Sequence, residues 1–413
     1  MRTASGTTPT SPIELDRGVP RGLTALLTTA MAFSMMQLFL IGALGPRFVD
    51  GLGVSEAVLG LTTTVGFGTA AVLSPVGGRI VDRVGPRRAL VGLLALAAAA
   101  LGLIGAAPGP ALLLAAVALG GLPQALANPA TNKAILAAVP APKRGVVAGA
   151  KQSGVQLGAF AAGLPLATAA GLFGWRGAVW VAAGAALLAS LWAWRALPAD
   201  PPPKAGAPSP GGGAPRAPSP GGGSLVAWLA AFSLFLGAGI ASVNTYLALF
   251  GVLRLGMGPA VAGTLVAVLG IAGIGGRVGW SRAATPGRAP WFPGLLAGGA
   301  VAAALLLALA VRVEPLVWVA AVAVGVFAVS GNAVSMVLVL QRSAPGRAGQ
   351  DSALVAAGFF AGFAVGPPLF GLLAERGRYG QGWLLVAAEF AVAGAVACAW
   401  ALRDRRTGGS TGA

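Results

Sequence analysis

The sequence predicts an all-α membrane protein in which twelve transmembrane helices form two pseudo-symmetric six-helix bundles. The chain has 413 residues, of which 56% are hydrophobic and only 9% are charged. A soluble domain carries about 25% charged residues, so lipid is the expected solvent for this chain. Twelve apolar runs follow one another, and a segment rich in Pro and Gly divides them six and six.

Each predicted span is a run of roughly 20 mostly apolar residues, the length that a helix needs to cross the hydrocarbon core. The runs lack the alternation of barrel strands, and a helix satisfies its backbone polar groups within its own segment. The runs are 22–45, 56–77, 89–107, 110–138, 146–170, 177–197, 225–250, 258–280, 291–312, 315–340, 350–374 and 382–402. The shortest connections, where hydropathy alone could fuse two spans, are Pro108-Gly109 and Val313-Glu314.

Five regions follow from these runs. They are a cytoplasmic tail at 1–21, a six-helix bundle at 22–197, a flexible cytoplasmic linker at 198–224, a second six-helix bundle at 225–403 and a cytoplasmic tail at 404–413. The linker is mainly Pro, Gly, Ala and Ser, so it has little to bury. The bundles echo each other, because GGRIVDRVGPRR begins at Gly77 and GGRVGWSRAATPGR begins at Gly275. Parallel repeats of this kind predict a binding site at their interface near mid-membrane.

The basic residues predict how the chain crosses the membrane. There are 28 Lys and Arg against 11 Asp and Glu, which gives a net charge of +17. With both termini in the cytoplasm, 20 of the basic residues fall in cytoplasmic segments and 6 in outside segments. This bias follows the positive-inside rule, so we expect a multi-pass protein of the inner (plasma) membrane. The charges lie in short gaps between apolar runs, and no basic helix or aromatic-rich sheet predicts nucleic-acid binding.

Several kinds of chemistry lack the residues they require. Cys398 is the single cysteine and there is no histidine, so neither a disulfide framework nor the usual metal and proton-transfer ligands are available. No GxxxxGK[ST] loop for ATP occurs. We therefore expect no enzyme activity, no cofactor and no metal site.

One connecting segment carries a family signature. Residues 78–88 read GRIVDRVGPRR, which resembles the motif G-x-L-x-D-R-x-G-R-[KR]-[KR] of the major facilitator superfamily, placed between its second and third helices. The matching positions are Gly78, Asp82, Arg83, Gly85, Arg87 and Arg88; Pro86 takes a usually basic position, and Trp280 replaces the acid in the second-half copy. The resemblance covers about residues 22–403. It implies the major facilitator fold and secondary active transport by alternating access.

The resemblance gives Asp82 a gating role. In the family this acid contacts the start of the eleventh helix in the outward-open state, which here is Gly349-Gln350-Asp351. A carboxylate near a helix N-terminus gains roughly 0.3–1 kcal/mol. Gly78 and Gly85 would permit a tight turn between the spans. The alternative is that Asp82 only balances the neighbouring arginines.

Candidate binding residues lie on the helices that the family uses for substrate. Gln124, Asn128 and Asn132 share one face of the span 110–138, and Lys133 lies about 100° around from that face. A charge at membrane depth favours a functional site, although a lysine near a helix end can also extend to the surface. The candidates are Gln37, Gln124, Asn128, Asn132, Lys133, Lys151, Gln152, Gln156, Asn244, Tyr246 and Asn332. The amides taken singly could instead make packing hydrogen bonds.

These residues predict a transporter for a small polar organic solute, and the two lysines favour an anionic one. The expected partners are this solute and the lipid bilayer, with the protein as a monomer. Glu389 is the only acid deep in a predicted span and a candidate carrier of a coupling proton, but its peripheral helix favours a structural role. A proton-coupled antiporter that exports drugs or metabolites is the alternative, favoured by Gly163-Leu164-Pro165, which resembles an interrupted antiporter motif. A non-transporting receptor or scaffold is the alternative of another class.

Overall fold

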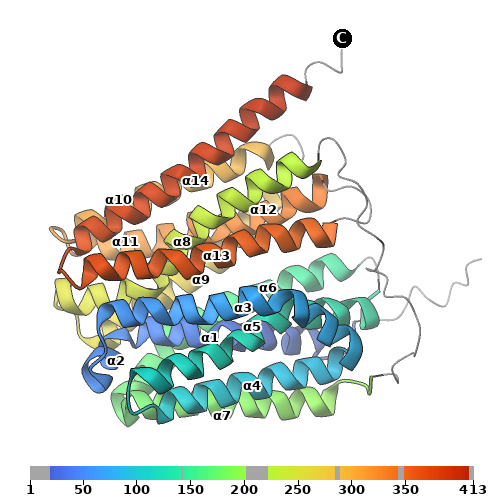
Figure 1. Ribbon diagram of the computed structural model, residues 1–413, viewed down its shortest axis with the longest axis horizontal. Helices are drawn as coiled ribbons and strands as arrows, with labels where there is room; N and C mark the ends of the chain where they lie inside the picture. Colours follow the sequence, from blue (N-terminus) through green and yellow to red (C-terminus); the bar gives the residue numbers. More distant parts are fainter. Residues whose placement is uncertain (1–18, 141–142, 201–221, 284–288, 343–347, 409–413) are drawn as a thin grey trace, which may run out of the picture.

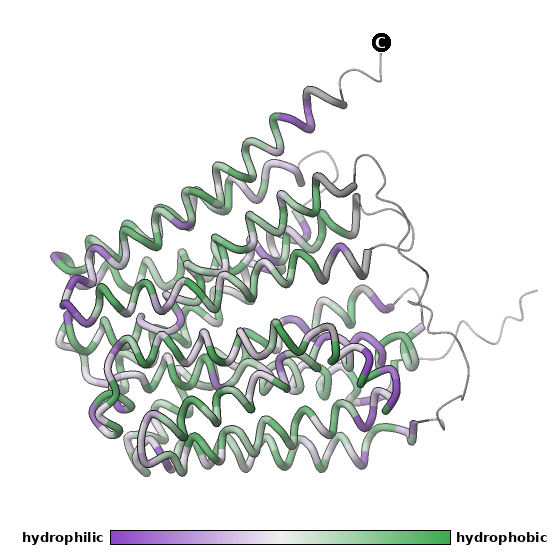
Figure 2. Tube along the Cα trace, viewed as in Figure 1, coloured by the Kyte–Doolittle hydropathy of each residue, from purple (hydrophilic) through white to green (hydrophobic). Residues whose placement is uncertain are grey.

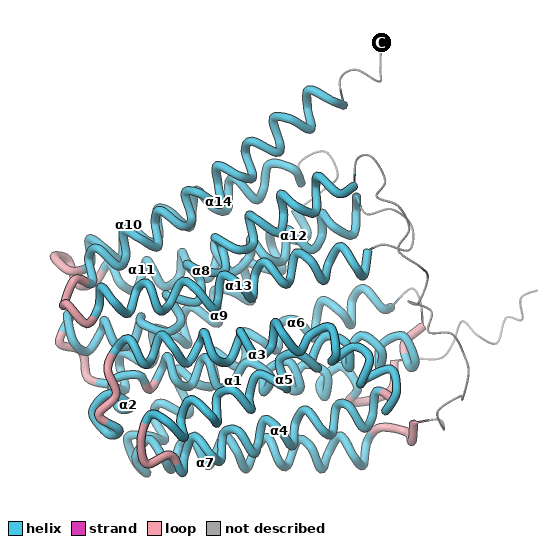
Figure 3. Tube along the Cα trace, in the orientation of Figure 1, coloured by secondary structure: helices cyan, strands magenta, loops and turns pink. Residues whose placement is uncertain are grey.

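The computed structural model describes residues 19–140, 143–200, 222–283, 289–342 and 348–408. These residues form helices joined by short loops, with no strand among them (Figure 3). The first half contains α1 (Leu23–Ala43), α2 (Gly45–Leu52), α3 (Glu56–Val84), α4 (Pro86–Ala106), α5 (Pro110–Ala138), α6 (Arg144–Ala161), the π-helix η3 (Ala162–Leu166) and α7 (Ala167–Ala196). The second half contains α8 (Gly222–Leu255), α9 (Pro259–Ala283), the 3₁₀ turn η4 (Ala289–Trp291), α10 (Phe292–Ala310), α11 (Leu316–Ala323), the π-helix η5 (Val324–Ala328), α12 (Val329–Arg342), α13 (Ala348–Ala374) and α14 (Tyr379–Gly408).

The described helices make twelve membrane crossings, as the sequence predicts. Eleven stretches are long and apolar enough to cross a bilayer, but one of them, Val146–Ala196, has 51 residues. A straight helix of that length would extend about 76 Å, more than twice the hydrocarbon thickness. Gly174 interrupts it with φ 71° and ψ 166°, a backbone conformation outside the helical region. The stretch is therefore two spans that meet at Gly174, and the protein is a multi-pass membrane protein.

The two halves form two adjacent layers of roughly parallel helices (Figure 1). Hydrophilic residues gather at the two ends of the helices, and the middle of each helix is mostly hydrophobic (Figure 2). Large apolar side chains such as Leu172 and Leu188 on α7 are 75% and 67% exposed. An apolar surface of this kind fits a lipid environment.

The layers have two distinct ends, which we name by their acids. The Glu56 end carries the start of α3 and the end of α13, on the left of Figure 1 beside α2. The Asp82 end carries the end of α3 and the start of α13. Close helix contacts join the halves: a Cβ on Gly42 of α1 would lie 1.9 Å from the carbonyl oxygen of Asn244 on α8, and one on Gly60 of α3 would lie 2.7 Å from that of Pro367 on α13. Glycine at these positions lets the backbones approach.

The family signature is mainly helical, which corrects its assignment to a loop. The helix α3 continues to Val84, so Gly78 lies inside it and makes no turn. Gly85 does turn, with φ 88°, before Pro86 starts α4. Arg277 falls within the predicted span 258–280 and lies inside α9, which continues to Ala283. The predicted linker and tails fall largely outside the described residues.

Candidate functional site

Lys151 is buried between helices of the first half. It lies on α6, and its side chain is 2% exposed. Its Nζ donates to Asn132 Oδ1 at 2.6 Å, to Thr131 Oγ1 at 2.7 Å and to Asn128 Oδ1 at 3.4 Å, all on α5. The ammonium therefore does not extend to the surface. All three acceptors are neutral, so they solvate its charge without balancing it.

The spacing of the amides on α5 explains this arrangement. Asn128 and Asn132 are four residues apart and so face α6 together. Thr131 was missed by sequence reasoning, because a hydroxyl in a helix usually bonds its own backbone; its Oγ1 is also 2.6 Å from the carbonyl of Ala127. These residues, with Lys151, form what we call the lysine site: Asn128, Thr131, Asn132 and Lys151.

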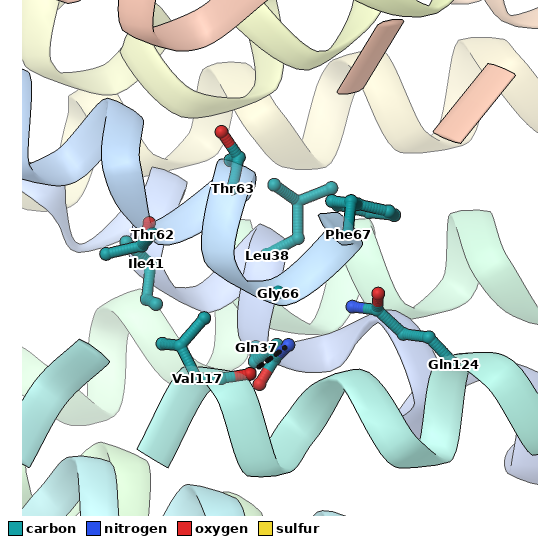
Figure 4. Close-up of a pocket in the computed structure, with 9 residues that line it drawn as sticks. All are labelled: Gln37, Leu38, Ile41, Thr62, Thr63, Gly66, Phe67, Val117 and Gln124. Atoms are coloured by element: carbon teal, nitrogen blue, oxygen red, sulfur yellow. Dashed lines mark hydrogen bonds between the residues drawn. The ribbon is translucent and has the colours of Figure 1, made fainter. Parts of the chain in front are cut away.

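Gln124 shares the face of Asn128 and Asn132 but does not join the lysine site. It lines a small cavity inside the first half together with Gln37 of α1 (Figure 4). The cavity has about 10 Å³, room for about one water. Gln37 Nε2 donates to the carbonyl of Val117 at 3.4 Å, while Gln37 Oε1 and both amide atoms of Gln124 are buried without a partner among the described residues.

The opposite side of α6 faces the second half. Gln152 and Gln156 are one turn apart on α6, and Gly273 and Arg277 are one turn apart on α9. Arg277 Nη1 donates to the carbonyl of Gln152 at 3.4 Å, and a Cβ on Gly273 would lie 3.1 Å from Gln156 Oε1. The two antiparallel helices therefore match residue by residue along this contact. The Oε1 atoms of both glutamines are buried without a described partner.

The helix α12 also packs against α9, and a Cβ on Gly273 would lie 3.2 Å from Val329 Cγ1 of α12 as well as close to Gln156. A Cβ on Gly276 would lie 2.5 Å from Ser330 Oγ, so α12 packs closely at this glycine. Ser330 Oγ and Asn332 Oδ1 are both buried without a described partner. Asn244, on α8, donates its Nδ2 to the carbonyl of Ile240 in its own helix at 2.8 Å.

Lys133, a candidate substrate-binding residue, lies apart from the lysine site. Its Nζ is 3.0 Å from Asp82 Oδ1 and 3.1 Å from the carbonyls of Val81 and Asp82. The 100° turn from Asn132 directs it toward the end of α3, where a cation is favoured by the helix dipole. The two side chains are 33% and 61% exposed, so solvent screens this ion pair.

A second acid, Asp200, lies at the signature segment and was missed in the sequence. Its Oδ1 and Oδ2 accept from the backbone N–H groups of Arg87 and Arg88, each at 2.9 Å, and so cap α4. The Arg87 guanidinium also lies 4.4 Å from the ring centre of Trp194 and donates to its carbonyl. Asp200 stands in the Pro-rich segment after α7, where no periodicity marks a functional acid. Arg83 is exposed.

Tyr246, a candidate substrate-binding residue, belongs to a contact between the halves at the Glu56 end. Its hydroxyl donates to the carbonyl of Glu56 at 2.7 Å, and its ring stacks on Phe370 at 4.6 Å. Tyr379 donates to Glu56 Oε2 at 2.6 Å, and the backbone N–H of Ala57 donates to Glu375 Oε1 at 3.3 Å. Three segments of the second half therefore hold the start of α3.

Glu389 lies on α14, which packs against α8 and α10 of its own half. It is 8% exposed, and its Oε2 is buried without a described partner. This position is away from the facing helices of the two halves, as its assignment to a peripheral helix implies.

The sequence matches one family model, and the fold is similar to solved transporter structures. A family model described as the Major Facilitator Superfamily matches residues 26–350. The structure resembles a bacterial homologue of the human lysosomal transporter Spinster in an inward-facing and occupied conformation, with a TM-score of 0.72 and 17% identity over 92% of this chain and 96% of that chain. The inward-facing, unoccupied form of the same homologue gives a TM-score of 0.70 and 18% identity over 93% of this chain and 96% of that chain.

A mutant of the nucleoside transporter NupG gives a TM-score of 0.71 and 13% identity over 91% of this chain and 99% of that chain. At identities this low, these likenesses show the fold alone. No curated protein matches the sequence.

Proposed function

Because the chain belongs to the major facilitator superfamily and has the fold of its transporters, we propose that it is a secondary active transporter that moves a small polar, anionic organic solute across the cytoplasmic membrane by alternating access. The observation that carries the proposal is the lysine site. Lys151 places an ionisable amino group at membrane depth with neutral acceptors around it and no carboxylate of a described residue paired to it. A charge there is costly unless a ligand compensates it.

The contacts at the Glu56 end support alternating access. The bias of basic residues places the Asp82 end in the cytoplasm and the Glu56 end outside. The hydrogen bonds of Tyr246, Tyr379 and Glu375 then close the outer side. Aromatic contacts continue this closure inward, with Phe67 of α3 4.5 Å from Phe363 of α13. We therefore assign the structure to the inward-facing state.

Asp82 is proposed to change partners between the two states. In the inward-facing state it pairs with Lys133. On closure of the cytoplasmic side it would leave Lys133 for the start of α13, the position that the signature segment gives it in the family. Lys133 thus belongs to the gate in this account and not to the solute site.

Solute flux in proteoliposomes tests the proposal. Vesicles containing the protein are loaded with an unlabelled small organic acid, and counterflow of the labelled acid is followed across a panel of acids and of their neutral amides. We expect counterflow for acids only, loss of it in Lys151→Gln and partial retention in Lys151→Arg. Lys143→Gln, at an exposed lysine before α6, is the matched control. Equal flux by wild type and Lys151→Gln would contradict the role of Lys151, and no flux for any solute would favour a receptor or scaffold.

The proton-coupled antiporter remains the second candidate, because Glu389 is buried with an unpartnered oxygen. It predicts that Glu389→Gln abolishes flux driven by a pH gradient while exchange of solute for solute continues. We propose that the protein works as a monomer, since one chain contains both halves.

A further inference from the structure

Arg277 is a second cation without a counter-ion among the described residues; it is partly buried and belongs to the other half. It lies on α9, six residues before the end of that helix, whereas Lys151 lies seven residues after the start of α6. Both positions are therefore about 10 Å inside the same end of the bundle. No carboxylate of a described residue forms an ion pair with Arg277.

The hydrogen bonds of Arg277 leave one edge of its guanidinium free. Nη1 donates to the carbonyl of Gln152, whereas Nε is buried without a described partner and Nη2 makes no hydrogen bond to a described residue. Nε and Nη2 are the parallel pair of donors with which arginine binds a carboxylate or phosphate at two points. A carbonyl oxygen is a weak substitute, because it carries no full charge.

Two polar groups without described partners lie on the helices that pack against α9 beside Arg277. Gln156 packs against Gly273, one turn before Arg277 on α9. Gln156 is 3% exposed, and its Oε1 has no described partner. Ser330 is fully buried against Gly276, the neighbour of Arg277, and its Oγ is also unpartnered. Buried polar groups normally find hydrogen bonds, so the unpartnered groups on these three helices are available to bind a ligand.

The internal repeat shows that this environment is specific to the second half. Arg277 follows the glycine pair at Gly275 as Arg79 follows the pair at Gly77. Arg79 is exposed at the Asp82 end, while Arg277 is turned against α6. The same motif position thus carries an exposed arginine in one half and a partly buried arginine that contacts α6 in the other.

We propose that the Nε–Nη2 edge of Arg277 binds an acidic group of the transported solute at the contact between α6 and α9, with Gln156 and Ser330 binding its other polar groups. The inference rests on the proposed transport function and narrows its solute to organic anions with a carboxylate or phosphate group. It places one cation in each half, so the solute would contact both halves as they move. Lys151 attracts the same anion from the far side of α6.

Binding to the purified full chain tests the proposal separately from transport. The probes are acetate, succinate and inorganic phosphate, with acetamide and succinamide as neutral counterparts, and the readout is the shift in melting temperature with probe concentration. We expect a saturable rise with an acidic probe and none with the amides. Arg277→Gln should abolish the rise, and Arg277→Lys should weaken binding about tenfold or more, because lysine keeps the charge but not the paired donors. Arg79→Gln is the matched control and should bind as wild type.

Two results would overturn the proposal. One is an Arg277→Gln protein that binds the acidic probes with wild-type affinity, which would leave Arg277 as a tie between α6 and α9. The other is a wild-type protein whose melting temperature no acidic probe raises. Counterflow of the same solutes separates this inference from the proposed function. Binding of acidic probes without flux would contradict transport alone. Flux of neutral solutes that persists in Arg277→Gln would contradict the anion site alone. Arg277→Lys keeps the test valid if Arg277→Gln fails to fold.

Discussion

The hydroxyl of Tyr379, the first residue of α14, donates to the carboxylate of Glu56, the first residue of α3, at 2.6 Å across the boundary between the two halves. The next residue of α3, Ala57, donates its backbone N–H to the carboxylate of Glu375, which lies just after the end of α13. Under the proposed function this terminus is the outer closure, and its bonds must break before the outward-facing state can form.

Tyr379→Phe should open this closure. It removes one hydrogen bond to a charged group, worth about 1.5 kcal/mol at the lower end of the usual range, which is roughly tenfold in the ratio of two states. The measurement is the rate at which an impermeant maleimide labels a cysteine introduced at Leu59, a fully buried residue near Glu56. We expect faster labelling in Tyr379→Phe. Glu314→Gln, at an exposed acid of the same end, should not change it, and an unchanged rate in Tyr379→Phe would mean that this bond does not hold the closure.

Lys133→Gln should favour the outward-facing state. It removes the ion pair with Asp82 that forms in the structure, and the effect is small, at most about 1 kcal/mol, because both side chains are solvent-exposed. Asp82→Asn loses this pair as well as its proposed contact with α13, which is worth about 1 kcal/mol. The second mutant should therefore lie closer to the inward-facing state than the first. Spin-label distances between the C-terminal ends of α7 and α9, at the Asp82 end, measure how far each mutant shifts toward the inward-facing state. If Lys133→Gln lay closer to that state than Asp82→Asn, Asp82 would have no role in the gate.

Lys151→Gln should abolish binding of acidic solutes without lowering the melting temperature. The glutamine amide can donate to the acceptors on α5, and the substitution removes a buried charge that no described carboxylate balances. Differential scanning fluorimetry with and without solute measures both quantities. A large loss of stability together with intact binding would make Lys151 a structural residue.

Asp200→Ala should destabilise the first half. The carboxylate caps two backbone N–H groups of α4, and loss of a cap costs about 0.5–2 kcal/mol. Gly85→Ala should cost at least as much, because φ is 88° and the new Cβ would lie 2.3 Å from Asp200 Cγ. Melting temperatures compared with Asp50→Ala, at an exposed acid, measure both effects. A wild-type melting temperature for Asp200→Ala would show that water replaces the cap.

The spans and part of the lysine site could be predicted from the sequence, because both depend on local pattern. Apolar run length defines a crossing, and the four-residue spacing of Asn128 and Asn132 places them on one face. Which helix that face meets is a tertiary property, so Gln124 of the same stripe meets Gln37 and not Lys151. Arg277 falls inside the predicted span 258–280, but its contact with Gln152 depends on how α6 and α9 pack, which the sequence does not show. Tyr246 lay on the right helix but at a depth that the sequence does not encode.

Alternating access requires opposite movements at the two ends of the bundle, so distances measured at both ends of the same protein test it. Spin labels at residues 50 and 376 report the Glu56 end, and labels at 195 and 282 report the Asp82 end, with Cys398 replaced by serine. These four positions are exposed and lie outside the proposed site and gate. In Tyr379→Phe we expect a longer distance at the Glu56 end together with a shorter distance at the Asp82 end. Distances that change at one end alone, or that lengthen at both ends, would contradict it.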